Sequence, residues 1–134
     1  METRFRVRYA ETDQMGIVHH SNYLVWMEAA RVEYCRTRGI CYRDIEANEG
    51  VFLAVAEVSC RYALPARFDD EIAVRAWIAD AHPRLVRFEY QIVNCNSGEH
   101  VATGETKHVF CGPDMKPRKL PEKYRAAFGI AKSS

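Results

Sequence analysis

Alternating hydrophobic and polar residues predict that much of this chain forms β-strands. The first alternation covers residues 4–9, where Phe5, Val7 and Tyr9 share one face and arginines occupy the other, as in a half-buried strand. Four longer strand-like runs follow Gly50, at residues 51–64, 72–81, 85–94 and 100–111. Short turn sequences rich in Pro, Asp, Asn and Gly separate these runs. Connections this short require antiparallel neighbours.

A helical period begins near Ser21. Apolar residues recur from there at intervals of four, three and four, which places them on one face of a helix: Tyr23, Met27, Ala30 and Tyr34. Leu24 and Trp26 widen this face, so the helix is expected to be covered on more than one side. Ser21 or Asn22 can cap its N-terminus, and Gly39 suits the position just after its C-terminus.

Two weaker segments complete the secondary-structure prediction. Residues 40–50 have no clean period and are expected to form a short helical or irregular link. Pro121 is placed to open a short last helix near residues 122–128. One long helix with an antiparallel sheet is an α+β fold rather than a doubly wound one. With 134 residues, a single domain over 1–134 is expected.

Composition and charge exclude several classes of protein. The formal net charge is +1 and 48% of the residues are hydrophobic, so a disordered chain and a partner such as nucleic acid or anionic lipid are not expected. The first residues lack the apolar core of a signal peptide, and the longest apolar run, 51–56, is too short to span a bilayer. The five cysteines are widely spaced without a C-x-x-C pair. This predicts reduced thiols, a cytoplasmic location and no metal site.

The loop before the long helix carries candidate chemistry. Asp13 and His20 lie seven residues apart, and Gly16 between them can adopt a backbone conformation closed to other residues. The loop can therefore return a carboxylate towards the helix N-terminus, whose free N–H groups carry partial positive charge. Such an arrangement can polarise a carbonyl while the carboxylate attacks it or activates water. On spacing alone, a turn residue bonded to its own backbone is the commoner interpretation of Asp13.

These residues belong to a longer motif. It is Tyr9-x3-Asp13-x2-Gly16-x-Val18-x-His20-x-Asn22-Tyr23, followed by Trp26-x-Glu28-Ala29-Ala30-Arg31. The motif closely resembles the 4-hydroxybenzoyl-CoA thioesterase family, most of all the small bacterial acyl-CoA thioesterases associated with the Tol–Pal system. Residues 61–70 and 117–121 also resemble family segments, so the resemblance covers nearly the whole chain. It implies the hotdog fold, in which a long antiparallel sheet wraps around one central helix.

The resemblance implies catalytic roles for three side chains. The family places its catalytic carboxylate, a nucleophile or a general base, at the position of Asp13. In this branch a histidine at the position of His20 and a tyrosine at that of Tyr9 line the same site. His20 could bond the thioester oxygen or protonate the departing sulfur, while Tyr9 could orient Asp13 or simply pack in the core. The backbone N–H of His20 or of Ser21 could stabilise the oxyanion.

Further charged residues are candidates for the site. Glu28 is a competing carboxylate, because another group of hotdog thioesterases carries its catalytic carboxylate on the helix, but the intact loop motif favours a structural role for it. Coenzyme A phosphates need cationic partners, and the candidates are Arg84, Arg87, Lys116, Arg118 and Lys119. Arg118 and Lys119 rank highest, because their Pro-flanked segment resembles the family. For any single one of them, an ordinary solvated surface position is the alternative.

The sequence thus predicts a cytoplasmic acyl-CoA thioesterase. It would hydrolyse a short-chain aliphatic or aromatic acyl-CoA to the free acid and coenzyme A, without a metal or redox cofactor. Two alternatives stay open: a hotdog hydratase or dehydratase, and a non-catalytic acyl-CoA-binding or scaffold protein. The resemblance also implies a homodimer or homotetramer with the site between subunits. Exposed sheet edges invite such pairing, and residues 85–94 are the strand expected at the two-fold axis.

Overall fold

One antiparallel sheet contains all the strands of the computed structural model, which describes residues 2–130. Residues 1 and 131–134, which the single-domain prediction includes, lie outside this described part. The sheet order is β1-β3-β4-β5-β2. The four longer predicted runs are confirmed as β2 to β5. The strand bounds are β1 (Glu2–Arg6), β2 (Phe52–Tyr62), β3 (Glu71–His82), β4 (Leu85–Asn94) and β5 (His100–Cys111).

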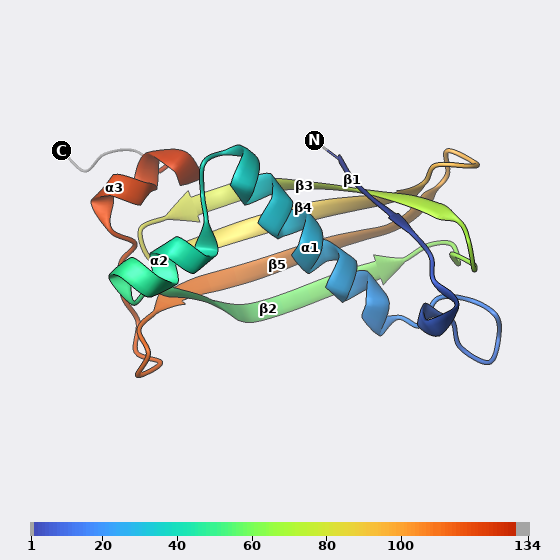
Figure 1. The fold of residues 1–134 in the computed structure, drawn as a ribbon, viewed down its shortest axis with the longest axis horizontal. Coiled ribbons are helices and arrows are strands. Elements are labelled where there is room, and N and C mark those ends of the chain that lie inside the picture. The colour runs from blue at the N-terminus through green and yellow to red at the C-terminus, as the bar shows by residue number, and fades with distance from the viewer. Residues whose placement is uncertain (1, 131–134) are drawn as a thin grey trace.

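A single long helix, α1 (Ser21–Thr37), crosses one face of this sheet (Figure 1). Its predicted apolar face is buried against the strands, since Tyr23, Met27 and Ala30 are almost fully inaccessible to solvent. Tyr34 extends the same face and packs edge-on against Phe88 of β4. The long antiparallel sheet around one central helix is the hotdog fold that the resemblance implies.

A glycine allows α1 to approach the sheet closely. Gly104 of β5 lies beneath Met27, and a Cβ at this position would clash with the Met27 thioether. Met27 is itself 1% exposed. A side chain at Gly104 would therefore require either Met27 or the helix to shift.

The shorter helices lie at the ends of the sheet. The link after α1 is helical, as α2 (Tyr42–Glu49). The last predicted helix is confirmed as α3 (Glu122–Arg125), which continues into the 3₁₀ helix η2 (Ala126–Phe128). A further 3₁₀ helix, η1 (Tyr9–Glu11), lies between β1 and the loop that carries Asp13.

The first predicted strand is wrong at its C-terminal end. β1 ends at Arg6, because the Val7 backbone then bonds to the turn before β3 through Asp69 and Asp70. Tyr9 consequently opens η1 instead of sharing a buried face with Phe5. Its side chain is 77% exposed.

The strand predicted at the two-fold axis is also wrong. Residues 85–94 form β4, which is hydrogen-bonded to β3 on one side and β5 on the other. A strand with both edges paired has no backbone groups left for a second chain. The edges of the sheet are β1 and β2, so any continuous sheet between two copies must use one of these.

The sequence predicts no membrane span, no metal site and reduced cysteines, and the structure describes residues 2–130. No helix in that range is long and apolar enough to cross a membrane. No group of three or more His, Cys, Asp or Glu residues in the same range is arranged to hold a metal ion. All five cysteines are free thiols.

Candidate active site

The loop between η1 and α1 is closed by its own backbone before the helix begins. The Asp13 N–H donates to the Ile17 carbonyl at 2.8 Å. Gly16 lies between them with a φ of +79°, which is the left-handed conformation expected for a glycine in this turn. The Val18 N–H donates to the Ala66 carbonyl at 2.8 Å. The loop is thereby attached to the segment that follows β2.

A buried carboxylate holds this loop against α1. Glu11 is 5% exposed, and its carboxylate accepts the Arg8 N–H at 2.7 Å and the Trp26 indole N–H at 2.9 Å. Burial by itself would raise the pKa of Glu11, but these two donors and the Arg8 guanidinium outweigh it and lower the pKa. The sequence prediction missed Glu11, because its partner Trp26 lies 15 residues away and no local sequence pattern indicates the bond.

Asp13 and His20 line the same pocket, which has a volume of about 410 Å³. One oxygen of Asp13, Oδ1, accepts the Met15 N–H at 2.8 Å, the bond expected of an ordinary turn aspartate. The other oxygen, Oδ2, accepts no hydrogen bond from the residues that the structure describes, so it is available to a ligand. The remaining lining residues come from the loop, the first turn of α1 and the end of β2: Met15, Ile17, Val18, Tyr23, Tyr62, Ala63, Leu64 and Pro65.

The N-terminus of α1 is not capped as predicted. The N-cap residue, His20, makes no side-chain cap hydrogen bond, the Ser21 hydroxyl lies 2.8 Å from Nδ1 of His19, and the Asn22 amide donates to the Glu11 carbonyl instead. The Ser21 N–H donates to the same His19 nitrogen at 3.3 Å. Within residues 2–130, the N–H of His20 has no hydrogen-bond partner. Of the two predicted oxyanion donors, His20 is therefore the free one.

Tyr62 is a pocket residue to which the sequence prediction gave no role. Its hydroxyl donates to the His20 carbonyl at 2.9 Å, and its ring packs edge-on against Tyr23. Burial, together with the nearby Cys60 thiol, raises the pKa of Tyr62 to about 12. The phenol therefore remains a hydrogen-bond donor at neutral pH and holds the start of α1 against the end of β2.

Two of the predicted site residues lie outside this pocket. The Tyr9 ring packs edge-on against Phe68 with 5.5 Å between ring centroids, so it neither fills the core nor lines the pocket. Glu28 lines a different groove, between β1 and α1, together with Phe5 and Val25. It lies eight positions after His20, which is about 12 Å along the helix axis.

Most of the predicted coenzyme A contacts gather at the opposite end of the sheet. Arg84 lies in the turn between β3 and β4, and its carbonyl accepts the Phe110 N–H at 3.2 Å. The Arg118 N–H in turn donates to the Phe110 carbonyl at 2.9 Å, so Arg84 and the segment with Lys116, Arg118 and Lys119 lie side by side. We call these four residues the basic end. Arg87 does not belong to it, because it is paired with Glu89 and Glu105 on the sheet face.

Within one chain, the basic end is far from the Asp13 pocket. Phe52, where β2 begins, pairs with Cys111 beside the basic end, whereas Tyr62, where β2 ends, lines the pocket. The 11 residues of β2 span about 33 Å at ~3.3 Å per residue. Figure 1 shows the same separation, with the loop before α1 at one end of the sheet and the segment after β5 at the other.

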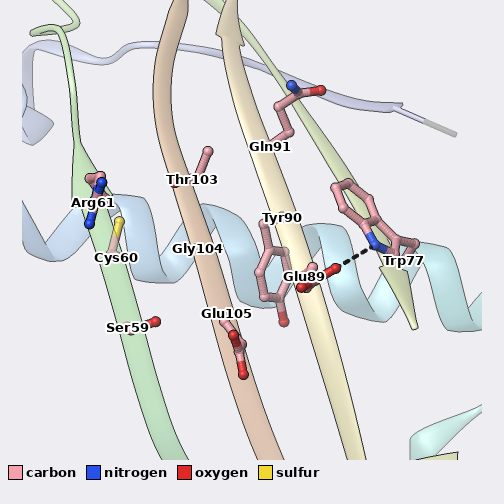
Figure 2. A pocket seen from close by; sticks show the side chains of 10 residues that line it. All are labelled: Ser59, Cys60, Arg61, Trp77, Glu89, Tyr90, Gln91, Thr103, Gly104 and Glu105. Atoms are coloured by element: carbon pink, nitrogen blue, oxygen red, sulfur yellow. Dashed lines mark hydrogen bonds between the residues drawn. The ribbon is translucent and has the colours of Figure 1, made fainter. Parts of the chain in front are cut away.

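A second pocket lies on the face of the sheet that faces away from α1 (Figure 2). It has a volume of about 560 Å³ and contains none of the predicted site residues. The Trp77 indole donates to Glu89 at 3.0 Å, and Arg87 bridges Glu89 and Glu105. Its carboxylates are thus already paired, and α1 lies on the other face of the sheet. The Asp13 pocket is therefore the better candidate for catalysis.

Comparison with known proteins agrees with the fold. Residues 7–128 match the model of the thioesterase-like superfamily. YneP of Bacillus subtilis is 37% identical over 91% of this chain and 85% of its own length. The acyl-CoA thioester hydrolase YbgC of Escherichia coli is 32% identical over 92% and 91% of the two chains. A DHNA-CoA thioesterase from Staphylococcus aureus superposes with a TM-score of 0.90 at 30% identity, covering 96% of this chain and 87% of that one. The chain belongs to the thioesterase-like superfamily.

Proposed function

We propose that this thioesterase hydrolyses an acyl-CoA to the free acid and coenzyme A, with Asp13 as its catalytic carboxylate. The observation that carries the proposal is that Asp13 and His20 line one pocket at the N-terminus of α1. The relatives named acyl-CoA thioesterases support the substrate class. The pocket volume suits a short-chain aliphatic or aromatic acyl group.

The free oxygen of Asp13 can serve in either of two ways. It can attack the thioester carbon and form a mixed anhydride that water then hydrolyses, or it can remove a proton from an attacking water. In both cases the C–S bond breaks, the sulfur leaves with its electron pair, and a proton is needed to form the thiol. The His20 imidazole, which lines the same pocket, is positioned to supply it. Neither route requires a metal or a redox cofactor.

The carbonyl oxygen gains negative charge when the tetrahedral intermediate forms. The His20 N–H has no partner among residues 2–130, whereas the Ser21 N–H already points to His19. We therefore assign the oxyanion contact to the His20 N–H, strengthened by the positive end of α1. A donor of this kind contributes roughly 3 kcal/mol to transition-state stabilisation.

The position of the basic end implies that a second copy completes the site. Two β2 strands pairing antiparallel across a two-fold axis place Phe52 of one copy next to Tyr62 of the other. The basic end of the second copy then approaches the Asp13 pocket, which one chain alone does not permit. Val55 and Val58 of β2 are about half exposed, as expected of an edge strand that is covered by a partner. We propose a homodimer joined at β2, either alone or doubled to a tetramer, working in the cytoplasm.

A thiol-release assay over a panel of acyl-CoAs tests this function. We expect hydrolysis of at least one aliphatic or aromatic member, unaffected by prior dialysis against a chelator. Binding without release of coenzyme A from any member would instead support the scaffold alternative, and hydration of an enoyl-CoA the hydratase alternative. A monomer mass by light scattering at micromolar concentration would contradict the dimer.

A further inference from the structure

A charged side chain is buried between α1 and the sheet without a charged partner. Arg31 of α1 is 8% exposed. Its guanidinium has five N–H donors, and one of its nitrogens, Nη1, donates to the Tyr90 hydroxyl at 3.1 Å. Within residues 2–130, no carboxylate forms a salt bridge with Arg31, and its Nε is buried without a hydrogen-bond partner.

The hydrogen bonds around Arg31 run in one direction. The Tyr90 hydroxyl lies 2.6 Å from Oγ1 of Thr106, which lies 2.8 Å from Nε2 of His108. An arginine only donates, so the Tyr90 hydroxyl accepts a hydrogen bond from Arg31 and donates one to Thr106. Thr106 can then donate to His108, which leaves the hydrogen of that imidazole on Nδ1. Nδ1 is itself buried without a partner among the described residues.

These four residues, Arg31, Tyr90, Thr106 and His108, are called the Arg31 cluster below. The cluster has more donors than acceptors, and its positive charge has no salt-bridged carboxylate among residues 2–130; the exposed Glu28 acts on Arg31 only at longer range. A buried charge without a partner is strongly unfavourable, and an unsatisfied buried group in a native protein requires an explanation, such as a bound water, an ion or a functional role. The chemical complement of the cluster is an oxygen acceptor with a negative charge.

An apolar track leads from the Asp13 pocket to this cluster. Tyr62, Cys60 and Val58 alternate along β2 on the face that carries α1, and Val58 pairs directly with Thr106. Tyr62 and Val58 are 44% and 45% exposed in the single chain, and in the proposed dimer the β2 strand of the second copy would border the track. From Tyr62 to Val58 is about 13 Å along the strand. Along α1, Tyr23 of the pocket and Arg31 lie about 12 Å apart.

We propose that the Arg31 cluster binds the distal carboxylate of an acyl group whose thioester lies at Asp13. The acyl chain would lie along Tyr62, Cys60 and Val58, with its apolar middle against apolar side chains. This inference rests on the proposed thioesterase function and extends its substrates to ω-carboxyacyl-CoAs long enough to span the track. The carboxylate supplies the charge that Arg31 lacks.

The test compares substrates of equal length. Wild-type protein is assayed with suberyl-CoA, octanoyl-CoA and ω-aminooctanoyl-CoA, which differ at the distal end alone. We expect kcat/KM to be at least ~10-fold higher for suberyl-CoA than for octanoyl-CoA, the usual size of a charged hydrogen bond, and lowest for the ammonium compound. Succinyl-CoA and butyryl-CoA are the matched short pair. Their ratio should not show this preference, because succinyl cannot reach Arg31.

The variant Arg31→Met keeps the side-chain volume and removes the charge. We expect the suberyl-to-octanoyl ratio of kcat/KM to fall towards one in this variant, and a ratio is insensitive to partial loss of folded protein. If the variant does not fold, the three-substrate series on the wild type decides by itself. A wild-type ratio near one, with octanoyl-CoA hydrolysed, would overturn this inference alone. Release of coenzyme A from no substrate would overturn the proposed function instead. An unchanged ratio with an altered oligomer mass in Arg31→Met would assign Arg31 to a subunit contact and also overturn the inference.

Discussion

The Asp13 loop and the Arg31 cluster are both polar, but they are built in opposite ways. The loop draws its residues from one stretch of chain before α1 and is held by backbone hydrogen bonds across Gly16. The cluster joins a side chain of α1 to side chains of β4 and β5, and Arg31 is 59 residues from Tyr90 in the sequence. The loop remains open to solvent, whereas His108 is fully buried. Catalysis needs the accessible arrangement, and the buried one is suited to selecting what the pocket accepts.

The largest expected difference between the two regions is in their response to acid. Burial, and then the nearby Arg31 charge, lowers the pKa of His108 to about 3. An unfolded chain binds a proton at this imidazole below a pKa of about 6.5, but the folded chain does not until about pH 3. Stability from His108 is therefore complete above pH 6.5 and is lost as the pH falls towards 3, by on the order of 4 kcal/mol.

The measurement is the free energy of unfolding against pH for the wild type and for His108→Gln, which cannot titrate. We expect the difference between the two proteins to shrink steadily from pH 6.5 to pH 3. A constant difference over this interval would mean that His108 takes up its proton in the folded protein, and the cluster would then be less buried than the structure shows.

The second prediction concerns the accessible region. Asp13→Asn keeps the size of the side chain but removes the negative charge that either a nucleophile or a general base requires. We expect kcat to fall at least ~10²-fold, a typical lower figure for a positioned acid or base, with little change in the free energy of unfolding. Glu28→Gln is the matched control on α1 and should change kcat far less. Full activity in folded Asp13→Asn would remove Asp13 from the site.

The contrast between the two regions also explains what the sequence could predict. The Asp13–Gly16–His20 spacing is local, and the alternating strands and the helix near Ser21 are local as well, so pattern and resemblance were sufficient for them. The position of residues 85–94 within the sheet depends on which strands pair, and nothing in that segment distinguishes a central strand from an edge strand. The same holds for the Arg31 cluster and for Tyr62, whose partners are set by tertiary pairing.

The third prediction tests what holds the loop in place. Glu11→Gln is nearly isosteric but replaces the charged acceptor that binds the Arg8 N–H and the Trp26 indole. We expect about 2 kcal/mol lower stability, as is usual for hydrogen bonds to a charged group. Chemical denaturation measures this loss, and kcat should also fall because the loop positions Asp13. An unchanged unfolding midpoint would show that Glu11 is not an anchor.

A smaller effect is expected at the basic end. The double variant Arg118→Ala and Lys119→Ala removes two charges proposed to meet coenzyme A phosphates, and we expect KM for acyl-CoA to rise about 5-fold, as for solvent-accessible charge pairs. Hydrolysis of an acyl-pantetheine should not change, because this substrate has no nucleotide phosphates. Arg118 also packs over Gly112, so equal losses on both substrates would indicate a structural role for the segment.

The smallest effect is expected at Tyr62 of β2, and Tyr9 of the first motif serves as its comparison. Tyr62 donates to the His20 carbonyl at 2.9 Å, and this bond positions the residue whose N–H is assigned to the oxyanion. Tyr62→Phe removes only the hydroxyl, so we expect a loss of about 1 kcal/mol in stability and a fall of about 3-fold in kcat, the equivalent of ~0.7 kcal/mol. Tyr9→Phe is the paired variant. The Tyr9 side chain lies outside the pocket and is largely exposed, so its hydroxyl should matter less than that of Tyr62. A larger loss of kcat in Tyr9→Phe than in Tyr62→Phe would restore the role that the resemblance implies for Tyr9, and it would require η1 to turn towards Asp13 when substrate binds.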